Sequence, residues 1–169
     1  MLIAEVIKKS PIILPLLCWF GVSFSAMPAY SQTCVVNSVS NGALTVSNLS
    51  QLLANDAVGT PANINVSCSA GTTFTITSVT NKGTPSAMNN VVDGVFAAIR
   101  SGSNTIARGE VSPSGSINPS NPPGIASAIQ TAPIVNKDYA VDLSIFRTLS
   151  QLLPAGTYTY QVNILLTPQ

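Results

Sequence analysis

The stretch that decides the fold is LPAGTYTYQVNILLTPQ, residues 153–169, at the end of the chain. After a Pro-Ala-Gly turn its side chains alternate, and the polar face consists mostly of threonine, glutamine and asparagine. The opposite face carries Tyr158, Tyr160, Val162, Ile164 and Leu166. A period of two residues is typical of a strand with one buried face. The sequence therefore predicts a long strand over residues 157–167, which needs a neighbour on each edge if neither edge is to be left exposed.

Charge is scarce over the whole chain: 8% of the 169 residues are charged and the formal net charge is +1. Such a balance gives no electrostatic basis for binding nucleic acid or an acidic membrane surface. The chain contains no histidine, which is the commonest general base and metal ligand. This composition is typical of an exported all-β protein, and the length is suited to one domain.

The N-terminus has the pattern of an export signal. Lys8 and Lys9 precede an apolar run over residues 11–24, and Ala29-Tyr30-Ser31 provides the small residues that signal peptidase requires. We therefore expect residues 1–31 to be a cleaved secretory signal and residues 32–169 to form the domain. An uncleaved membrane anchor is the alternative, although the apolar run is short for a membrane-spanning helix.

Residues 32–169 retain two cysteines, Cys34 and Cys68. An even pair in an exported protein favours a disulfide, which for a loop of this size stabilises the fold by about 4 kcal/mol. A zinc site is the other use of paired thiols, but two cysteines without histidine cannot complete one.

The rest of the domain before the last strand also has the pattern of β-strands. Residues 62–69 and 74–79 predict a hairpin, and residues 137–147 alternate again with Tyr139, Val141, Leu143 and Ile145 on one face. Shorter segments are less clearly patterned: a strand is favoured over a helix for residues 91–100, a loop for 49–54, and a short edge strand for 126–129. About seven strands and no convincing helix predict an antiparallel β-sandwich.

Three blocks of this sequence resemble the spore coat protein U domain family, which is related to the pilin subunits of archaic chaperone–usher pili. They are Cys34 near the start of the domain, INVSCSAGTTFTI around Cys68, and LSIFRTLSQLLPAGTYTYQVNILLTP at the end. The resemblance implies an immunoglobulin-like sandwich that lacks its last strand. It also implies an open groove, filled first by a strand from a periplasmic chaperone and later by one from another subunit.

By this resemblance, the groove is lined by the last strand and the turn before it, through Gly156, Tyr158, Tyr160, Val162, Ile164 and Leu166. The implied partners are a periplasmic pilus chaperone, an outer-membrane usher and pilin-like subunits. The implied location is the periplasm and then the cell surface or the medium, with membrane contact only through the export signal. Two departures stand out: Pro168 replaces the usual aromatic residue, and cleavage at Ser31 would leave almost no donor segment before Cys34. We therefore expect a chain that receives a strand.

Catalysis is not expected. The acidic residues of the domain are scattered, and only Asp138 and Asp142 lie close together in the sequence. We expect Asp142 to form at most a surface ion pair with Arg147, which would contribute little. There is no Gly-x-Ser-x-Gly motif, no histidine base, and no pattern for a metal or cofactor. The alternatives to a pilin-like subunit are a self-sufficient coat or matrix module and a sugar-binding adhesin domain, although the aromatic residues mostly occupy positions expected in the core.

Overall fold

The structure is a computed structural model that describes residues 2–8, 32–83, 94–112, 119–147 and 152–169. Over these residues it is an all-β sandwich of mainly antiparallel strands, without a helix, as the sequence predicts. The apolar run of the expected signal and its cleavage position lie outside the described residues.

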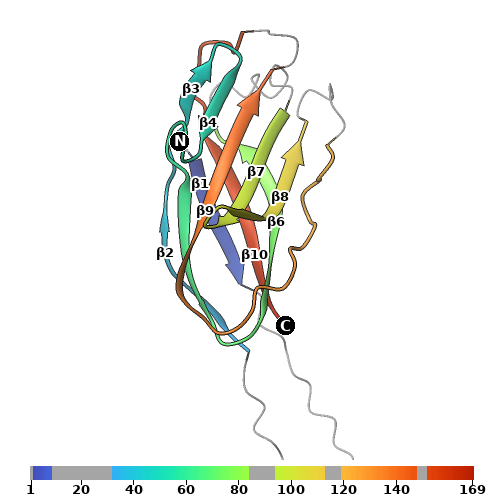
Figure 1. Cartoon of the computed structure of the whole chain (residues 1–169). Helices are drawn as coiled ribbons and strands as arrows, with labels where there is room; N and C mark the ends of the chain where they lie inside the picture. Colours follow the sequence, from blue (N-terminus) through green and yellow to red (C-terminus); the bar gives the residue numbers. More distant parts are fainter. Residues whose placement is uncertain (1, 9–31, 84–93, 113–118, 148–151) are drawn as a thin grey trace, which may run out of the picture.

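The smaller sheet has three strands and contains the strand that closes the chain (Figure 1). Its order is β1 (Leu2–Lys8), β10 (Tyr160–Pro168) and β6 (Thr72–Asn81). β10 pairs antiparallel with β6 and parallel with β1. β10 is therefore the central strand of this sheet, with a neighbour on each edge.

The larger sheet has seven strands and is antiparallel throughout. One edge of its long central strand, β9 (Ile134–Phe146), pairs with β5 (Ala62–Cys68) and β4 (Gln51–Ala54). Beyond these lie β2 (Cys34–Ser40), next to β5, and β3 (Thr45–Asn48), next to β4. The other edge of β9 pairs with β7 (Gly94–Ser101), which pairs in turn with β8 (Asn104–Val111).

The core lies between the two sheets and follows the alternation of the sequence. Every second residue of β5 is buried, as is every second residue of β10 from Tyr160 to Leu166. Tyr139, Val141, Leu143 and Ile145 are all at most 1% exposed, which confirms the face predicted for this strand. The rings of Phe74 and Tyr139 meet across the core with centroids 4.5 Å apart. Burial of these large side chains is the main stabilising contribution to the sandwich.

Four expectations for local structure were wrong or imprecise. Residues 62–69 and 74–79 do not form a hairpin, because the short turn between them carries the chain from β5 in the larger sheet to β6 in the smaller one. Residues 49–54 contain strand β4, because Leu52 and Ala54 are buried against β9; four residues are too few for alternation to stand out in the sequence. The last strand begins at Tyr160 and not at residue 157. Residues 126–129 do not form a regular strand, but Ala126 and Gln130 make isolated bridges to β6.

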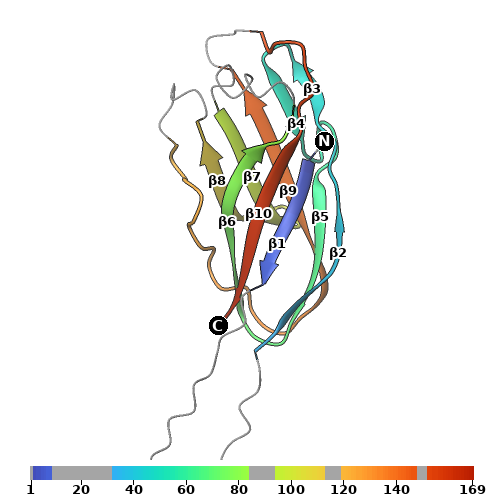
Figure 2. The ribbon, with the colours of Figure 1, turned by 180° about the vertical axis from the view of Figure 1, so that it is seen from behind.

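The two sides of the sandwich differ in what closes them (Figure 2). On one side β6 approaches β8, so closely that a Cβ on Gly109 would lie 2.7 Å from Cγ2 of Ile76. On the other side β1 lies beside β10 and approaches β2 and β5 of the larger sheet. The second side contains the candidate site.

Candidate strand-accepting edge

The candidate site is the edge of β10 that points away from β6, from Tyr160 to Leu166, which we call the β10 edge. β1 pairs with it in one unbroken register, from Leu2 opposite Tyr160 to Lys8 opposite Leu166. Figure 2 shows β1 running beside β10 in the same direction. All hydrogen-bonding positions on this edge are therefore matched by a strand from the far end of the sequence.

This pairing differs from every other strand pair among the described residues. Pairs among the strands from β2 to β10 are antiparallel, whereas β1 and β10 are parallel. A parallel pair cannot be joined by a tight turn and is slightly less stable per residue than an antiparallel pair. β1 also lies within residues 1–31, which the sequence assigns to a removable export signal. The β10 edge is thus covered by a segment that is not expected to stay with the domain.

The structure separates the six residues that the sequence places at the groove into two groups. Tyr160, Val162, Ile164 and Leu166 lie on β10 with their side chains buried in the core. Gly156 and Tyr158 precede β10 and line an apolar pocket of about 400 Å³ at the end of the sandwich, together with Leu44, Val46, Asn48, Leu49, Leu52, Leu153, Pro154 and Ala155. No sequence pattern indicated the contribution from β3 and β4, because those residues come next to Gly156 only in the folded protein.

Two contacts fix the segment that leads from the pocket into β10. The hydroxyl of Tyr158 donates a hydrogen bond to the carbonyl oxygen of Pro154 (2.7 Å), and the backbone N–H of Lys82 donates to the carbonyl oxygen of Thr159 (2.7 Å). Gly83 lies so close that a Cβ there would be 2.1 Å from the carbonyl oxygen of Thr157. The backbone next to β6 is therefore held in place up to the start of β10.

Tyr160 marks the boundary between the pocket and the core. Its hydroxyl is buried and has no hydrogen-bond partner among the described residues. Burial, and secondarily the neighbouring Tyr158, raise the pKa of Tyr160 to about 12. The hydroxyl therefore stays protonated at neutral pH, and a charged tyrosinate plays no part at this edge.

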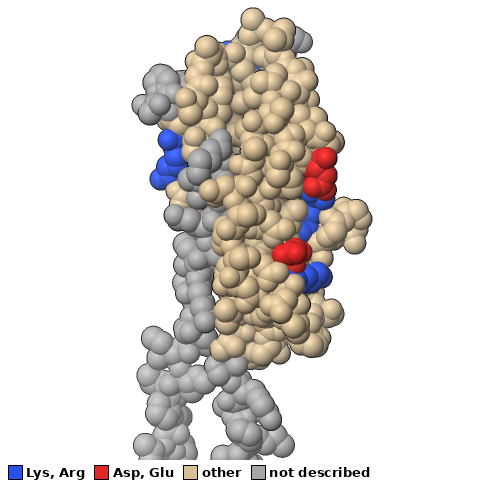
Figure 3. All heavy atoms as spheres, turned by 90° about the vertical axis from the view of Figure 1, so that its left-hand side faces the viewer, with Lys and Arg blue, Asp and Glu red and all other residues tan. Residues whose placement is uncertain are grey.

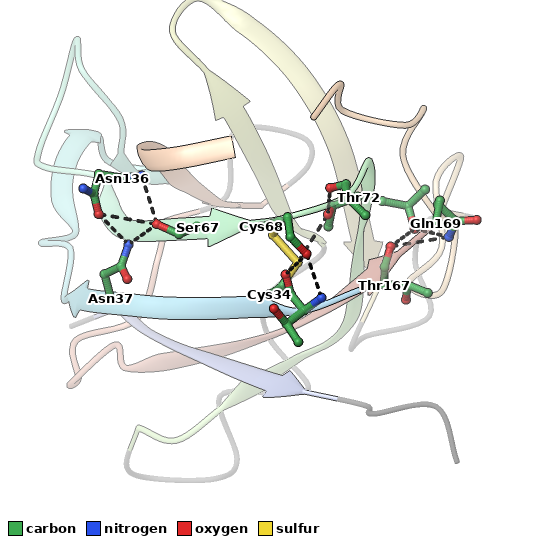
Figure 4. Close-up of a disulfide and its surroundings, with 12 residues drawn as sticks. Cys34, Asn37, Ser67, Cys68, Thr72, Asn136, Thr167 and Gln169 are labelled. Carbon is green, nitrogen blue, oxygen red and sulfur yellow. Dashed lines mark hydrogen bonds between the residues drawn. A yellow bond between two sulfur atoms is a disulfide. The ribbon is translucent and has the colours of Figure 1, made fainter. Parts of the chain in front are cut away.

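The disulfide lies on the opposite sheet, on the same side of the molecule (Figure 4). Cys34 and Cys68 are cross-strand partners in β2 and β5, and their bond confirms the predicted pair. Next to it the backbone N–H of Ser69 donates to the carbonyl oxygen of Thr33 (3.0 Å). β2, the strand of the larger sheet that faces β1, is thus tied covalently to the strand beside it.

Further along β2, side-chain amides and hydroxyls link three strands. Asn37 donates to the side-chain oxygens of Asn65 (2.7 Å), Ser67 (2.9 Å) and Asn136 (3.1 Å). Asn65 donates in turn to the carboxylate of Asp138 (2.7 Å). These groups are exposed, so each bond contributes little by itself, but together they keep β2 in register with β5. Figure 3 shows few charged side chains on this side of the molecule.

Arg100 lies between two carboxylates on the larger sheet. Arg100 forms two hydrogen bonds to Asp142, through Nε (2.5 Å) and Nη2 (2.9 Å), and an ion pair with Asp56 (2.8 Å). The expected pair of Asp142 with Arg147 was wrong, because β7 places Arg100 directly beside β9. The bonds to Asp142, with a smaller contribution from Asp56, raise the pKa of Arg100 further above its ordinary value.

No group of three or more histidine, cysteine, aspartate or glutamate side chains lies together in the described part of the chain. The described residues also include no helix that is long and apolar enough to cross a membrane. The β10 edge and the pocket beside it are therefore the features that carry a functional proposal. No protein-family model and no curated protein matches this chain.

Proposed function

We propose that this protein is a non-catalytic, exported structural subunit of a surface pilus or coat, and that residues 32–169 accept a strand from a partner at the β10 edge. The partners proposed from the resemblance are a periplasmic chaperone, an outer-membrane usher and pilin-like subunits. The protein would pass through the periplasm to the cell surface.

One observation carries the proposal: the β10 edge is paired over seven residues with a strand that the sequence assigns to a removable segment. If residues 1–31 are removed, this edge loses its neighbour and exposes unpaired backbone groups beside a buried apolar face. Strand addition to such an edge gains affinity from main-chain hydrogen bonds and register from alternate side chains.

A self-sufficient coat or matrix module is the second candidate, and the same pairing favours it if residues 1–31 remain attached. The chain would then supply its own last neighbour and would need no partner strand. A sugar-binding role has less support, because Phe74, Tyr139 and Tyr160 are buried and their rings offer no open stacking platform.

The two candidates are separated by producing residues 32–169 alone, in an oxidising compartment that allows the disulfide to form. We expect low solubility and a low unfolding temperature, because the β10 edge lacks a neighbour. Adding a synthetic peptide of residues 1–9 (MLIAEVIKK) as a model strand should raise the unfolding temperature in proportion to its concentration. A scrambled peptide of the same composition is the matched control.

The opposite result would favour the self-sufficient module. A soluble monomer of residues 32–169 that unfolds cooperatively, with no response to the peptide, would rule out a strand-accepting subunit. Equal stabilisation by the scrambled peptide would show general hydrophobic adsorption and would also count against the proposal.

A further inference from the structure

The β10 edge leads directly to the apolar pocket beside Gly156. The ladder between β10 and β6 continues one residue beyond the start of β10, because the backbone N–H of Lys82 donates to the carbonyl oxygen of Thr159 (2.7 Å). Tyr158 lies two residues before Tyr160 and lines the pocket, so it continues the inward-facing alternation of β10. Opposed residues of paired strands have their side chains on the same face of the sheet. The residue of an accepted strand opposite Tyr158 would therefore face the pocket.

The pocket suits an apolar group. Its volume is about 400 Å³, and none of the described residues that line it is charged. The side-chain oxygen of Asn48 in its wall already accepts hydrogen bonds from the backbone N–H (2.9 Å) and the hydroxyl (2.8 Å) of Ser50. The hydroxyl of Tyr158 donates to the carbonyl oxygen of Pro154 (2.7 Å). A polar group that entered the pocket would give up hydrogen bonds to water, whereas an apolar group gains by leaving water.

Two residues that line the pocket are also exposed at the surface. Val46 is 64% exposed and Leu49 is 74% exposed. They belong to β3 and to the turn that follows it, whereas Tyr158 belongs to the segment before β10. A partner side chain placed in the pocket would remove apolar surface of both molecules from water, which favours association.

From these observations we infer that the accepted strand carries one large apolar side chain, at the position opposite Tyr158, and that this side chain fills the pocket and fixes the register of the strand. The inference rests on the proposed function, because it names a feature of the partner that binds at the same site.

The β10 edge by itself discriminates poorly between registers. Its inward-facing residues from Tyr160 to Leu166 are all large and apolar, and the hydrogen-bonding backbone is the same along the whole edge. A slip of the partner by one residue would turn its apolar side chains outwards, but a slip by two residues keeps every side chain on its own face. The pocket lies at one end of the edge, so a side chain that fills it selects one register.

The test uses the protein purified after export of the full chain, and peptides based on residues 1–9 (MLIAEVIKK), whose register is defined by Leu2 opposite Tyr160. In that register, one residue added before the methionine comes opposite Tyr158. Three acetylated peptides carry phenylalanine, glycine or aspartate there and are otherwise identical. We expect the phenylalanine peptide to bind about tenfold more tightly than the glycine peptide, and the aspartate peptide to bind more weakly than either. Fluorescence anisotropy of labelled peptides measures the dissociation constants.

A substitution in the pocket shows whether this preference arises there. Val46→Asp places a charge in the pocket wall and should bring the ratio of the phenylalanine and glycine dissociation constants close to one. Val135→Asp, at a 68% exposed position at the start of β9 and outside the pocket, is the matched control and should keep the ratio of the unsubstituted protein. Because the ratio is taken within each protein, a general effect on folding cancels.

Cross-linking reads the register directly. Each peptide carries cysteine in place of Glu5, which pairs with Asn163, and the protein carries one new cysteine through Gln161→Cys, Asn163→Cys or Leu165→Cys. With the phenylalanine peptide, we expect the yield at position 163 to exceed the yields at positions 161 and 165 by about fivefold or more. With the glycine peptide, the three yields should lie closer together.

This test and the test of the proposed function fail separately. Equal binding of the phenylalanine and glycine peptides, a preference that survives Val46→Asp, or equal cross-linking of the phenylalanine peptide at all three positions would overturn the inference and leave the strand-accepting subunit in place. If none of the peptides binds, the proposed function is itself wrong, and the inference falls with it.

Discussion

The two sides of the sandwich are closed by parts of the chain with different origins. Between β6 and β8 the closing segment comes from the middle of the domain, residues 119–133, shown in orange along the right of Figure 1. This segment runs along β6 and is hydrogen-bonded to it. The backbone N–H of Gly124 donates to the carbonyl oxygen of Ile76 (2.8 Å), and that of Ser127 donates to the carbonyl oxygen of Phe74 (2.8 Å). Between β10 and β2 the closing segment is β1, from the start of the chain.

The difference separates a side closed from within residues 32–169 from a side closed by a segment of the expected export signal. The β6–β8 side is held by an irregular segment that is bonded to both layers, and Gly109 brings the layers into direct contact. The β10–β2 side is closed by a regular strand that pairs along one edge of β10. An irregular, side-chain-anchored closure is difficult to exchange, whereas a regular edge accepts any strand of suitable pattern.

The largest effect is expected from removing the covalent link on the β10–β2 side. Cys34→Ala/Cys68→Ala should lower the free energy of unfolding by about 4 kcal/mol, because the unfolded chain gains the entropy of an open loop. Urea unfolding measures the loss, and the wild-type protein unfolded with a reductant present should show the same value. A change below about 1 kcal/mol would mean that β2 is held by other contacts.

The next effect comes from the β6–β8 side. Ile76 is fully buried, is paired with Ile164 and packs against Gly109. Ile76→Ala should cost about 3 kcal/mol, from lost burial and a cavity. Thr80→Ala, at an exposed position of the same strand, is the control and should change stability by less than about 0.5 kcal/mol. Equal losses in the two variants would contradict the packing described for this side.

A substitution at the contact itself tests how closely the layers meet. Gly109→Ala places a methyl group 2.7 Å from Cγ2 of Ile76 and should cost about 2 kcal/mol through overpacking. Combined with Ile76→Ala, which makes room for that methyl group, the cost should be clearly less than additive in a double-mutant cycle. Strictly additive changes in the free energy of unfolding would show that the two side chains do not contact each other.

A smaller effect, with a defined pH dependence, is expected where Glu110 anchors the closing segment. Its carboxylate accepts hydrogen bonds from the backbone N–H groups of Ser120 (2.8 Å) and Asn121 (3.3 Å) and from the side-chain amide of Asn121 (2.9 Å). Burial alone would raise the pKa of Glu110. The bonds from Asn121 and Ser120, helped by nearby Arg108, outweigh burial and hold the pKa below its ordinary value of 4.5.

Because the pKa is lower in the folded protein, this stabilisation is present above pH 4.5 and is lost as the pH falls through the folded-state pKa. Glu110→Gln should therefore cost about 1–2 kcal/mol at pH 7, and the difference from wild type should shrink towards zero in acid. Thermal unfolding over a pH series measures this. Asp138→Asn is the control, because it removes an exposed carboxylate but keeps an acceptor oxygen for the bond from Asn65. A difference that grows in acid would show that Glu110 is not a charged anchor.

The regular parts of the fold could be predicted because burial leaves a period of two in the sequence. The faces of β9 and of β10 from Tyr160 onward follow directly from their alternation, and the disulfide follows from an even pair of cysteines in a chain that we expect to be exported. β4 was missed because four residues carry too little pattern. The pairing of Arg100 with Asp142 was missed because it depends on β7 lying next to β9, a tertiary fact with no local signal.

The candidate site was predictable only in part, for the same reason. Alternation identifies the buried face of β10, but pairing along a strand edge involves the backbone, which is the same for every residue type. The pairing of Leu2–Lys8 with β10 therefore left no sequence signal that distinguished it from the start of an export signal. The pocket beside Gly156 also combines residues from β3, β4 and the turn before β10, which are distant in sequence.

Hydrogen exchange of the β10 amides tests most directly whether the β10 edge takes a strand from outside the domain. Alternate amides of β10 point to β6 and to the β10 edge. In residues 32–169 alone we expect those facing β6 to stay protected and those on the β10 edge to exchange rapidly. In the full chain, or with the peptide of residues 1–9 added, both sets should be protected. Equal protection of both sets in residues 32–169 alone would contradict a strand-accepting edge.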